Sequence, residues 1–196
     1  VDAAKNFTLK NLNLNSCPTE TKFFVSNKNR EIGKNFIHKD KFNIVLGVGS
    51  SGPTTKWGVA NYSNLINKLN LENNFYFYLL CGNNESNISN EIMDKIIKKN
   101  CLSLHNMTIK QIIPILTSCN MYVGNDSFGS HITSQSGIKS IVILLDSPKA
   151  YTDYSKNFYR IIPRGFDIDK ISHGSNADPN LVLVEDVIKN INRLKN

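Results

Sequence analysis

The sequence lacks any long hydrophobic run. No stretch approaches the roughly 18 uninterrupted apolar residues of a membrane-spanning helix, and Val1 to Asn15 contain no apolar core of a signal peptide. We therefore expect neither a signal peptide nor a membrane anchor in it. With 196 residues, of which 40% are hydrophobic, the chain is nevertheless able to bury a core. This is typical of one globular domain, with or without a tail.

Cysteine is scarce, and its positions do not have the spacing of a metal site. Cys17, Cys81, Cys101 and Cys119 are far apart in the sequence. Three of them lie at the edges of apolar segments, where a free cysteine behaves as a small core residue. The sequence therefore predicts free thiols, no metal site, and a reducing, cytoplasmic location.

Arginine is rare although the chain is basic. The net charge is +7, but only 4 of the 23 basic residues are arginine, and the lysines do not cluster with aromatic residues. Lysine, asparagine and isoleucine fill 69 of the 196 positions, as an AT-rich coding sequence would produce. We attribute the positive charge mainly to lysines on a solvated surface, and therefore expect no nucleic-acid partner. Nucleic-acid binding is the weaker alternative.

The chain divides into a weakly patterned start and a strongly patterned remainder. We expect residues 1–40 to form a connector or arm, with a short helix over Lys28–Ile37. From residue 41, continuous apolar runs alternate with helical spacing. The expected strands are Phe42–Val48, Phe75–Cys81, Cys101–Leu104, Met121–Val123, Ser140–Leu145 and Phe158–Ile162. The expected helices lie near Ala60–Leu69, Ile88–Ile97, Thr108–Ser118, His131–Ser136 and Val184–Leu194.

This alternation predicts an α/β domain over residues 41–196, with a doubly wound, Rossmann-like parallel sheet. Apolar residues in continuous runs indicate strands that are covered on both faces. In such a sheet, ligands bind at the carboxyl ends of the strands. The loops that follow the predicted strands are therefore the places to search for a site.

The loop after the first strand contains a literal GxGxxG pattern in Gly47, Gly49 and Gly52. A dinucleotide site requires a helix at the third glycine and an acidic residue about 20 positions later. Here the helical spacing starts only near Ala60, and Pro53 follows the third glycine. A Walker loop is also excluded, because no Gly-Lys-Ser/Thr is present. An NAD-dependent Rossmann enzyme is therefore a weak alternative.

The same loop suits a phosphate group better. Backbone amides and hydroxyls of Gly49, Ser50 and Ser51 are of the kind that cradles phosphate oxygens, and Lys56 adds a positive charge. A surface loop rich in Ser, Thr and Gly is an equally good interpretation of these residues taken alone.

Two further loops place polar residues directly after strands. Glu85 either stabilises the start of the next helix or accepts hydrogen bonds from a ribose diol. In Val123–His131, the Ser127 hydroxyl and the amides that follow are suited to a phosphate. A catalytic triad is not indicated, because triad members come from separate elements. His131 is either part of this site or a core histidine.

In this order, the loops resemble those of glycosyltransferase family nine, the ADP-heptose:lipopolysaccharide heptosyltransferases and their relatives. The resemblance runs from about Asn43 to Leu194. The motifs that carry it are Val123–Ser127 with His131, Gly49–Ser51 with Lys56-Trp57, Gly82–Glu85, and His105–Ile109.

The family has the GT-B architecture of two Rossmann-like domains, and the resemblance implies that this chain is the C-terminal, donor-binding domain. It implies a diphosphate at Ser50, Ser51 and Lys56, ribose at Glu85, and a base near Met107. The donor-binding residues implied by position are Gly49, Ser50, Ser51, Lys56, Glu85, Met107, Asp126, Ser127, Gly129 and His131. Of these, Lys56 and Asp126 are the candidate catalytic residues, with Asp126 near the sugar or ribose.

The resemblance implies an inverting transfer from a nucleotide sugar, expected to be an ADP-sugar, without a cofactor or a metal. The family's acceptor domain, which supplies the general base, is missing from this sequence, so we expect the chain alone to be inactive. The expected acceptor is a membrane glycolipid in lipopolysaccharide or cell-surface glycan synthesis, which would place the enzyme at the inner face of the membrane. A non-catalytic nucleotide-binding module of the same fold is the alternative.

The sequence departs from the family pattern at three points. Phe128 stands where the family usually has glycine, and Lys56 is directly followed by Trp57, where the family separates them by one residue. Asp146 replaces a glycine that usually follows the next strand. These departures concern the grip on the phosphates and the identity of the donor.

Overall fold

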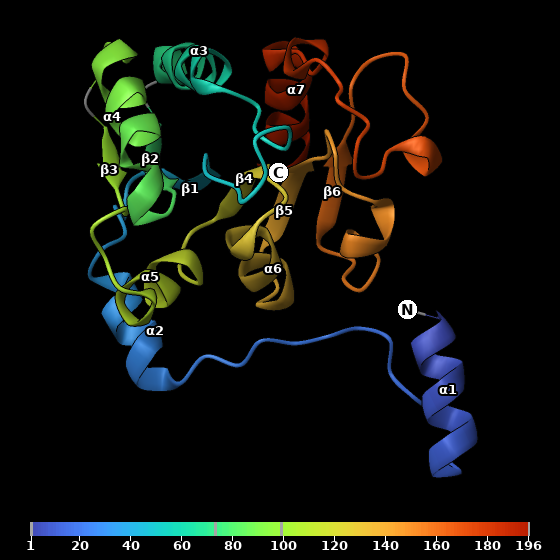
Figure 1. Ribbon diagram of the computed structural model, residues 1–196. Helices are drawn as coiled ribbons and strands as arrows, with labels where there is room; N and C mark the ends of the chain where they lie inside the picture. Colours follow the sequence, from blue (N-terminus) through green and yellow to red (C-terminus); the bar gives the residue numbers. More distant parts are fainter. Residues whose placement is uncertain (1, 73, 99, 196) are drawn as a thin grey trace.

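A computed structural model describes residues 2–72, 74–98 and 100–195 of the chain. Six parallel strands form one sheet in the order β3-β2-β1-β4-β5-β6 (Figure 1). The strands are β1 (Phe42–Gly47), β2 (Phe75–Leu80), β3 (Cys101–Ser103), β4 (Met121–Asn125), β5 (Lys139–Ile143) and β6 (Phe158–Ile161). This is the strand order of a doubly wound Rossmann-like sheet, which confirms the predicted fold class.

Helices cover both faces of the sheet. The α-helices are α1 (Asp2–Leu12), α2 (Asn27–Lys34), α3 (Val59–Leu69), α4 (Ser86–Lys95), α5 (Ile109–Leu116), α6 (Phe128–Gln135) and α7 (Val184–Lys195). Short 3₁₀ turns are η1 (Asn70–Glu72), η2 (Asn83–Glu85), η3 (Lys149–Thr152), η4 (Ile168–Lys170) and η5 (Pro179–Leu181). Helices α3, α4 and α7 lie on one face, and α2, α5 and α6 lie on the other (Figure 1).

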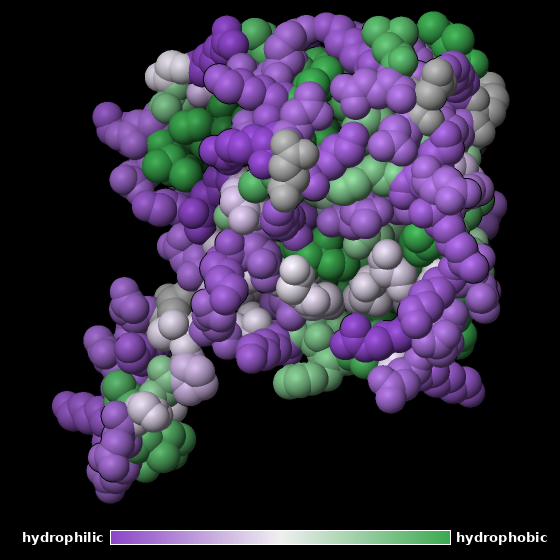
Figure 2. Space-filling view, turned by 180° about the vertical axis from the view of Figure 1, so that it is seen from behind, coloured by the Kyte–Doolittle hydropathy of each residue, from purple (hydrophilic) through white to green (hydrophobic). Residues whose placement is uncertain are grey.

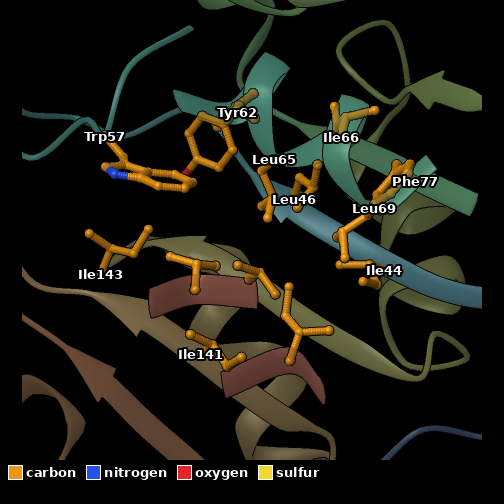
Figure 3. Packing of buried hydrophobic residues seen from close by; sticks show 14 of the residues in the cluster. Ile44, Leu46, Trp57, Tyr62, Leu65, Ile66, Leu69, Phe77, Ile141 and Ile143 are labelled. Atoms are coloured by element: carbon orange, nitrogen blue, oxygen red, sulfur yellow. The ribbon is translucent and has the colours of Figure 1, made fainter. Parts of the chain in front are cut away.

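The core on the α3 side is built from alternate residues of the strands. Ile44 and Leu46 of β1 point toward this face, where they meet the apolar stripe of α3 (Figure 3). Trp57 and Tyr62 pack edge to face there, with their ring centroids 5.0 Å apart. Val45, between the two β1 residues, points to the opposite face instead. Burial on both faces explains why the strands read as continuous apolar runs.

Two helix boundaries differ from the sequence prediction. Helix α4 ends at Lys95, so Ile97 lies beyond it and is 83% exposed instead of facing the core. Helix α6 begins at Phe128, three residues before His131. Helix α5 begins with a capping box, in which the Thr108 amide donates to Gln111 Oε1 over 2.9 Å.

Residues 1–40 contain two helices where one was expected. Helix α1 buries none of its residues and projects away from the sheet, with Phe7 70% exposed (Figures 1 and 2). Helix α2 packs on α5, where a Cβ at Gly33 would lie 2.2 Å from the carbonyl oxygen of Pro114. The segment between α1 and α2 also contacts the domain, because the Thr21 amide donates to the Tyr154 carbonyl over 3.2 Å and the Phe23 amide to the Gln135 carbonyl over 2.9 Å.

The strand order reverses direction between β1 and β4, and two glycines meet there. Gly47 of β1 pairs with Gly124 of β4. A Cβ on Gly124 would lie 2.5 Å from the carbonyl oxygen of Gly47 and 2.6 Å from its amide nitrogen. Because both obstructing atoms are backbone, only glycine permits the two strands to approach this closely. The loops after β1 and β4 diverge from this point, which is where such sheets bind ligands.

Replacement of Gly124 by alanine is expected to destabilise the domain by about 3 kcal/mol, because the strands must separate to admit a methyl group. Urea unfolding followed by circular dichroism measures the change. Gly82→Ala is the matched control, since its Cβ would lie 3.6 Å from the nearest neighbour, Glu85 Oε2, at an ordinary contact distance. Equal stability of the two variants would contradict the account of the Gly47–Gly124 contact.

Candidate functional site

Beside a hollow of about 460 Å³ that Lys56 lines together with Ser50 and Glu85, the loops after β1, β2, β3, β4 and β5 meet at the carboxyl edge of the sheet and border two further cavities. The first, here called the β2-side cavity, has a volume of about 440 Å³ and lies among Leu80, Glu85, His105 and Met107. The second, here called the β5-side cavity, has a volume of about 430 Å³ and includes Asp126, His131, Asp146 and Tyr151. The residues that line both cavities are Ser50, Ser51, Ser127 and Phe128.

Lys56 is held at the site by Glu85. The Lys56 ammonium lies 2.7 Å from Glu85 Oε1, which also accepts a hydrogen bond from the Ser50 amide over 3.2 Å. The second carboxylate oxygen accepts from the Gly82 amide over 3.3 Å. Burial alone would raise the pKa of Glu85, but these hydrogen bonds outweigh it and hold the pKa below its usual range. Glu85 therefore remains ionised, stabilises its own turn and fixes the Lys56 charge beside Ser50.

A buried asparagine joins the loop after β1 to the end of β4. Asn125 Oδ1 accepts hydrogen bonds from the Trp57 amide over 2.9 Å and from the Tyr62 hydroxyl over 3.1 Å. Its Nδ2 donates to the carbonyl of Val48 over 3.0 Å. Sequence reasoning assigned no function to Asn125, because its partners are distant in the chain. The only indication in the sequence was that this polar residue directly follows an apolar strand.

Trp57 fixes the other end of this loop. Its indole Nε1 donates to the carbonyl of Val182 over 2.9 Å, and its side chain is fully buried. Helix α3 begins at Val59, seven residues after Gly52. The tight turn of a dinucleotide site, with the helix starting at the third glycine, is therefore not formed here.

Asp126 and His131 lie side by side at the β5-side cavity. The Asp126 side chain is only 5% exposed, and its Oδ1 lies 3.3 Å from His131 Nε2. Among the residues that the structure describes, this buried oxygen has no hydrogen-bond partner.

His131 is not a core histidine, because a third of its side chain is exposed. Its Nδ1 contacts the hydroxyl of Tyr154, and the two rings stack with their centroids 5.9 Å apart. Burial raises the pKa of Tyr154 to about 12, so that its phenol stays neutral. The contacts with Asp126 and Tyr154 together fix the orientation of the imidazole.

The start of α6 faces the space between the two cavities. Ser127 is the N-cap, and the amides of Phe128 and Gly129 are among the first of the helix, which leaves them without intrahelical acceptors. A Cβ on Gly129 would lie 2.4 Å from a methyl group of Leu80, so this glycine lets α6 approach β2. The helix end thus offers amides and partial positive charge to an anion.

Asp146 connects two loops that border the β5-side cavity. Its carboxylate accepts hydrogen bonds from the Thr54 hydroxyl over 2.5 Å and from the Ser175 amide over 2.7 Å. The Thr54 hydrogen bond, helped by the Ser175 amide and opposed by burial, holds the pKa of Asp146 below its usual range. This residue, which replaces a glycine of the family pattern, therefore ties the loop before Lys56 to the segment after β6.

The β2-side cavity has an apolar end. Met107 lines it together with Leu80, Ile109 and Ile112, and His105 stands beside them. Apolar walls with a few polar groups are typical of sites for planar organic ligands. The structure thus brings together the residues predicted after four different strands, from Gly49 to His131.

Neither a metal site nor a membrane-spanning helix occurs in the described part of the chain. In it, no three His, Cys, Asp or Glu side chains gather in an arrangement that could hold a metal ion. No helix within the described ranges is long and apolar enough to cross a membrane.

A family model matches most of the chain, and several solved structures share its fold. The sequence model of the family described as Glycosyltransferase family 9 (heptosyltransferase) matches residues 2–162. No curated protein sequence matches the chain. At 19% identity and a TM-score of 0.72, the chain is similar in structure to ADP-heptose lps heptosyltransferase II from E. coli, with 88% of this chain and 53% of that protein covered.

Two further solved structures have the same fold. One is a family 9 glycosyl transferase from Veillonella parvula DSM 2008, at 14% identity and a TM-score of 0.76, covering 92% of this chain and 55% of that protein. The other is the E. coli heptosyltransferase WaaC with ADP, at 15% identity and a TM-score of 0.73, covering 96% of this chain and 54% of that protein. The chain therefore spans about half the length of these proteins.

Replacement of Thr54 by valine is expected to raise the pKa of Asp146 toward its usual value, because the strongest hydrogen bond to the carboxylate is lost. A lowered pKa in the folded state stabilises the protein above the unfolded-state pKa of about 3.9, and this effect disappears as the pH falls through the folded-state pKa. The variant should therefore be less stable by about 1 kcal/mol at pH 7 and by less near pH 3.

Carboxyl NMR titration and urea unfolding at the two pH values measure these effects. Thr55→Val is the matched control, because the Thr55 hydroxyl lies within hydrogen-bond distance of Ser50 Oγ and the Gly52 carbonyl and does not contact Asp146. An unchanged pKa of Asp146 in Thr54→Val would contradict the hydrogen bond between the Thr54 hydroxyl and the Asp146 carboxylate.

Proposed function

Because the chain belongs to glycosyltransferase family 9, the heptosyltransferase family, we propose that it is the nucleotide-sugar-binding half of an inverting glycosyltransferase. The proposed donor is an ADP-sugar, in line with the ADP that accompanies the similar E. coli WaaC structure. Since the chain spans about half the length of its solved relatives, the acceptor and the general base are assigned to a second, N-terminal domain.

The observation that supports this proposal is that one set of amides and hydroxyls lines both cavities. Ser50 and Ser51 on one side, and Ser127 with the start of α6 on the other, line both cavities. A ligand that fills both must place its middle between these groups. Amides, hydroxyls and the nearby Lys56 are suited to a diphosphate, which is the middle of a nucleotide sugar.

The remaining parts of the donor follow from this placement. The apolar end of the β2-side cavity, near Met107, would take the nucleobase, and Glu85 would accept hydrogen bonds from the ribose. The sugar would occupy the β5-side cavity, which Asp126 and His131 line. Glu85 thus has two roles, because it also holds Lys56.

The chemistry of this half is electrostatic. In an inverting displacement, negative charge develops on the diphosphate as its bond to the anomeric carbon breaks. Lys56, the amides of the loop and the start of α6 are fixed in advance around that charge, which lowers the barrier without reorganisation. The Asp126 carboxylate would favour the positive charge that develops on the sugar ring. A base from the second domain would remove the proton of the acceptor hydroxyl.

Two finer parts of the proposal depend on the family alone. The acceptor is proposed to be a membrane glycolipid in lipopolysaccharide or cell-surface glycan synthesis. The net charge of +7 would then help to hold the protein near anionic lipid at the inner face of the membrane. A non-catalytic nucleotide-binding module is the alternative, and it would bind the same nucleotide without transferring sugar in the two-domain protein.

The chain is expected to bind ADP, and Lys56→Ala is expected to weaken this binding about tenfold, or about 1.4 kcal/mol, because one charge-assisted contact to the diphosphate is lost. Isothermal titration calorimetry with ADP, GDP, UDP, CDP and NAD measures the affinities. Lys39→Ala is the control, because Lys39 precedes β1 and so lies at the opposite edge of the sheet.

NAD binding that competes with ADP would instead favour the dinucleotide alternative. Equal affinity of the wild type, Lys56→Ala and Lys39→Ala for ADP would contradict the placement of the diphosphate.

A further inference from the structure

Arginine is rare in this chain, and three of its four arginines gather at one edge of the sheet. Arg160, Arg164 and Arg193 lie on or beside the edge strand β6 and helix α7 (Figure 1). Residues of these two elements line a hollow of about 390 Å³, here called the β6–α7 hollow. It shares no lining residue with the three cavities at the carboxyl edge. In a chain whose basic residues are mostly lysine, this gathering of arginines marks a place where the guanidinium geometry is used.

The two carboxylates near the β6–α7 hollow are already paired. Asp186, which lines the hollow, accepts hydrogen bonds from Nε and Nη2 of Arg164, both over 3.0 Å. Asp153 accepts a hydrogen bond from Nη2 of Arg160 over 2.6 Å. Each pair consists of one positive and one negative charge, so the two pairs together contribute no net charge to the hollow.

Two further cations line the same hollow without a carboxylate partner. Lys189 and Arg193 are exposed and stand one turn apart on the same side of α7. Within the part of the chain that the structure describes, neither forms an ion pair. Nη2 of Arg193 donates instead to Oδ1 of Asn190 over 2.8 Å. The hollow therefore carries two uncompensated positive charges, which favour an anion.

The end of the edge strand adds a backbone donor. The carbonyl of Ile161 faces β5, because it accepts a hydrogen bond from the Leu144 amide over 2.9 Å. The two residues are joined by a trans peptide, so the N–H group of Ile162 points the opposite way, away from the sheet. Ile162 lines the hollow, and among the described residues its N–H group has no acceptor. An anion in the hollow would supply one.

We propose that the β6–α7 hollow binds the phosphate group of an organic phosphate ester. Arginine, lysine and a backbone N–H group are the donors that proteins use for phosphate oxygens. The volume of the hollow lies within the roughly 300–1,000 Å³ typical of small-molecule sites, which leaves room for the organic part of the ester. A lipid headgroup and a soluble phosphate ester carry this same group. The site is separate from the proposed donor site and does not depend on it.

The test is a proton–nitrogen NMR titration of the intact 196-residue chain with glycerol 3-phosphate. The largest shifts are expected at the amide of Ile162 and along α7 from Lys189 to Arg193. The double variant Lys189→Gln/Arg193→Gln keeps good helix formers on α7 but removes both charges. It should weaken binding about fivefold, the effect of losing two exposed charge contacts.

The control is Lys5→Gln/Lys10→Gln, which removes the same two charges from α1, a helix that projects away from the sheet. Its affinity for glycerol 3-phosphate should equal that of the wild type. Sedimentation with vesicles of phosphatidylglycerol in phosphatidylcholine, compared with pure phosphatidylcholine, identifies the source of the phosphate. Vesicle binding that only the α7 variant loses would support a lipid headgroup. Binding of glycerol 3-phosphate without such vesicle binding would support a soluble ester.

Three results would overturn the phosphate site. They are no binding of glycerol 3-phosphate or of the vesicles, equal weakening in the two double variants, and shifts confined to Ser51 and Phe128. None of them concerns the binding of ADP, so the proposed function would stand. Conversely, shifts at Ile162 and α7 in a chain that binds no nucleotide would support the phosphate site and contradict the proposed function.

Discussion

The buried side chain of Asn125 is the interaction on which the site depends. The Asn125 side chain forms hydrogen bonds with backbone groups of the loop after β1, at Val48 and Trp57. These bonds take the place of the backbone hydrogen bonds that a neighbouring strand would form. Both halves of its amide are used, so a buried polar group is satisfied and does not weaken the core. Together with the hydrogen bonds of Thr54 to Asp146 and of Trp57 to Val182, it holds the loop from Gly49 to Lys56 in place relative to the end of β4.

The charges of the site are arranged around this fixed loop. Lys56 is paired with Glu85, so the free site does not carry an exposed excess of positive charge beside Ser50. Asp126, buried next to His131, adds a negative charge about where a sugar would lie. The proposed donor has the complementary pattern, with anionic phosphates in the middle and hydroxyls at both ends. In this account specificity comes from the two ends, and affinity comes from the diphosphate.

Much of the fold was predictable from local pattern. The strands from β1 to β6 were found because residues buried on both faces form continuous apolar runs, and Phe75–Leu80 is an example. Helix α3 was found from its single apolar stripe. Helix α1 was not expected, because it buries no residue and so leaves no stripe in the sequence. The predicted start of α6, at His131, lies three residues after the observed start at Phe128. The Gly-Ser pair in the first turn of this helix is not typical of a helical sequence.

The site was predictable only in part. Gly49, Lys56, Glu85 and Asp126 follow predicted strands, and topology brings such loops together. The partnership between Lys56 and Glu85 was not predictable, because it joins residues on two loops whose spacing carries no periodic signal. The tie at Asp146 was not predictable either, since its two donors, Thr54 and Ser175, are distant in the chain.

The measurement that tests this account most directly is a crystal structure of the chain grown with ADP. The account predicts density for the diphosphate between Ser50 and the start of α6, with Lys56 in contact, the ribose at Glu85 and the base beside Met107. Density for ADP at any other place, or a diphosphate that touches neither Lys56 nor α6, would contradict it.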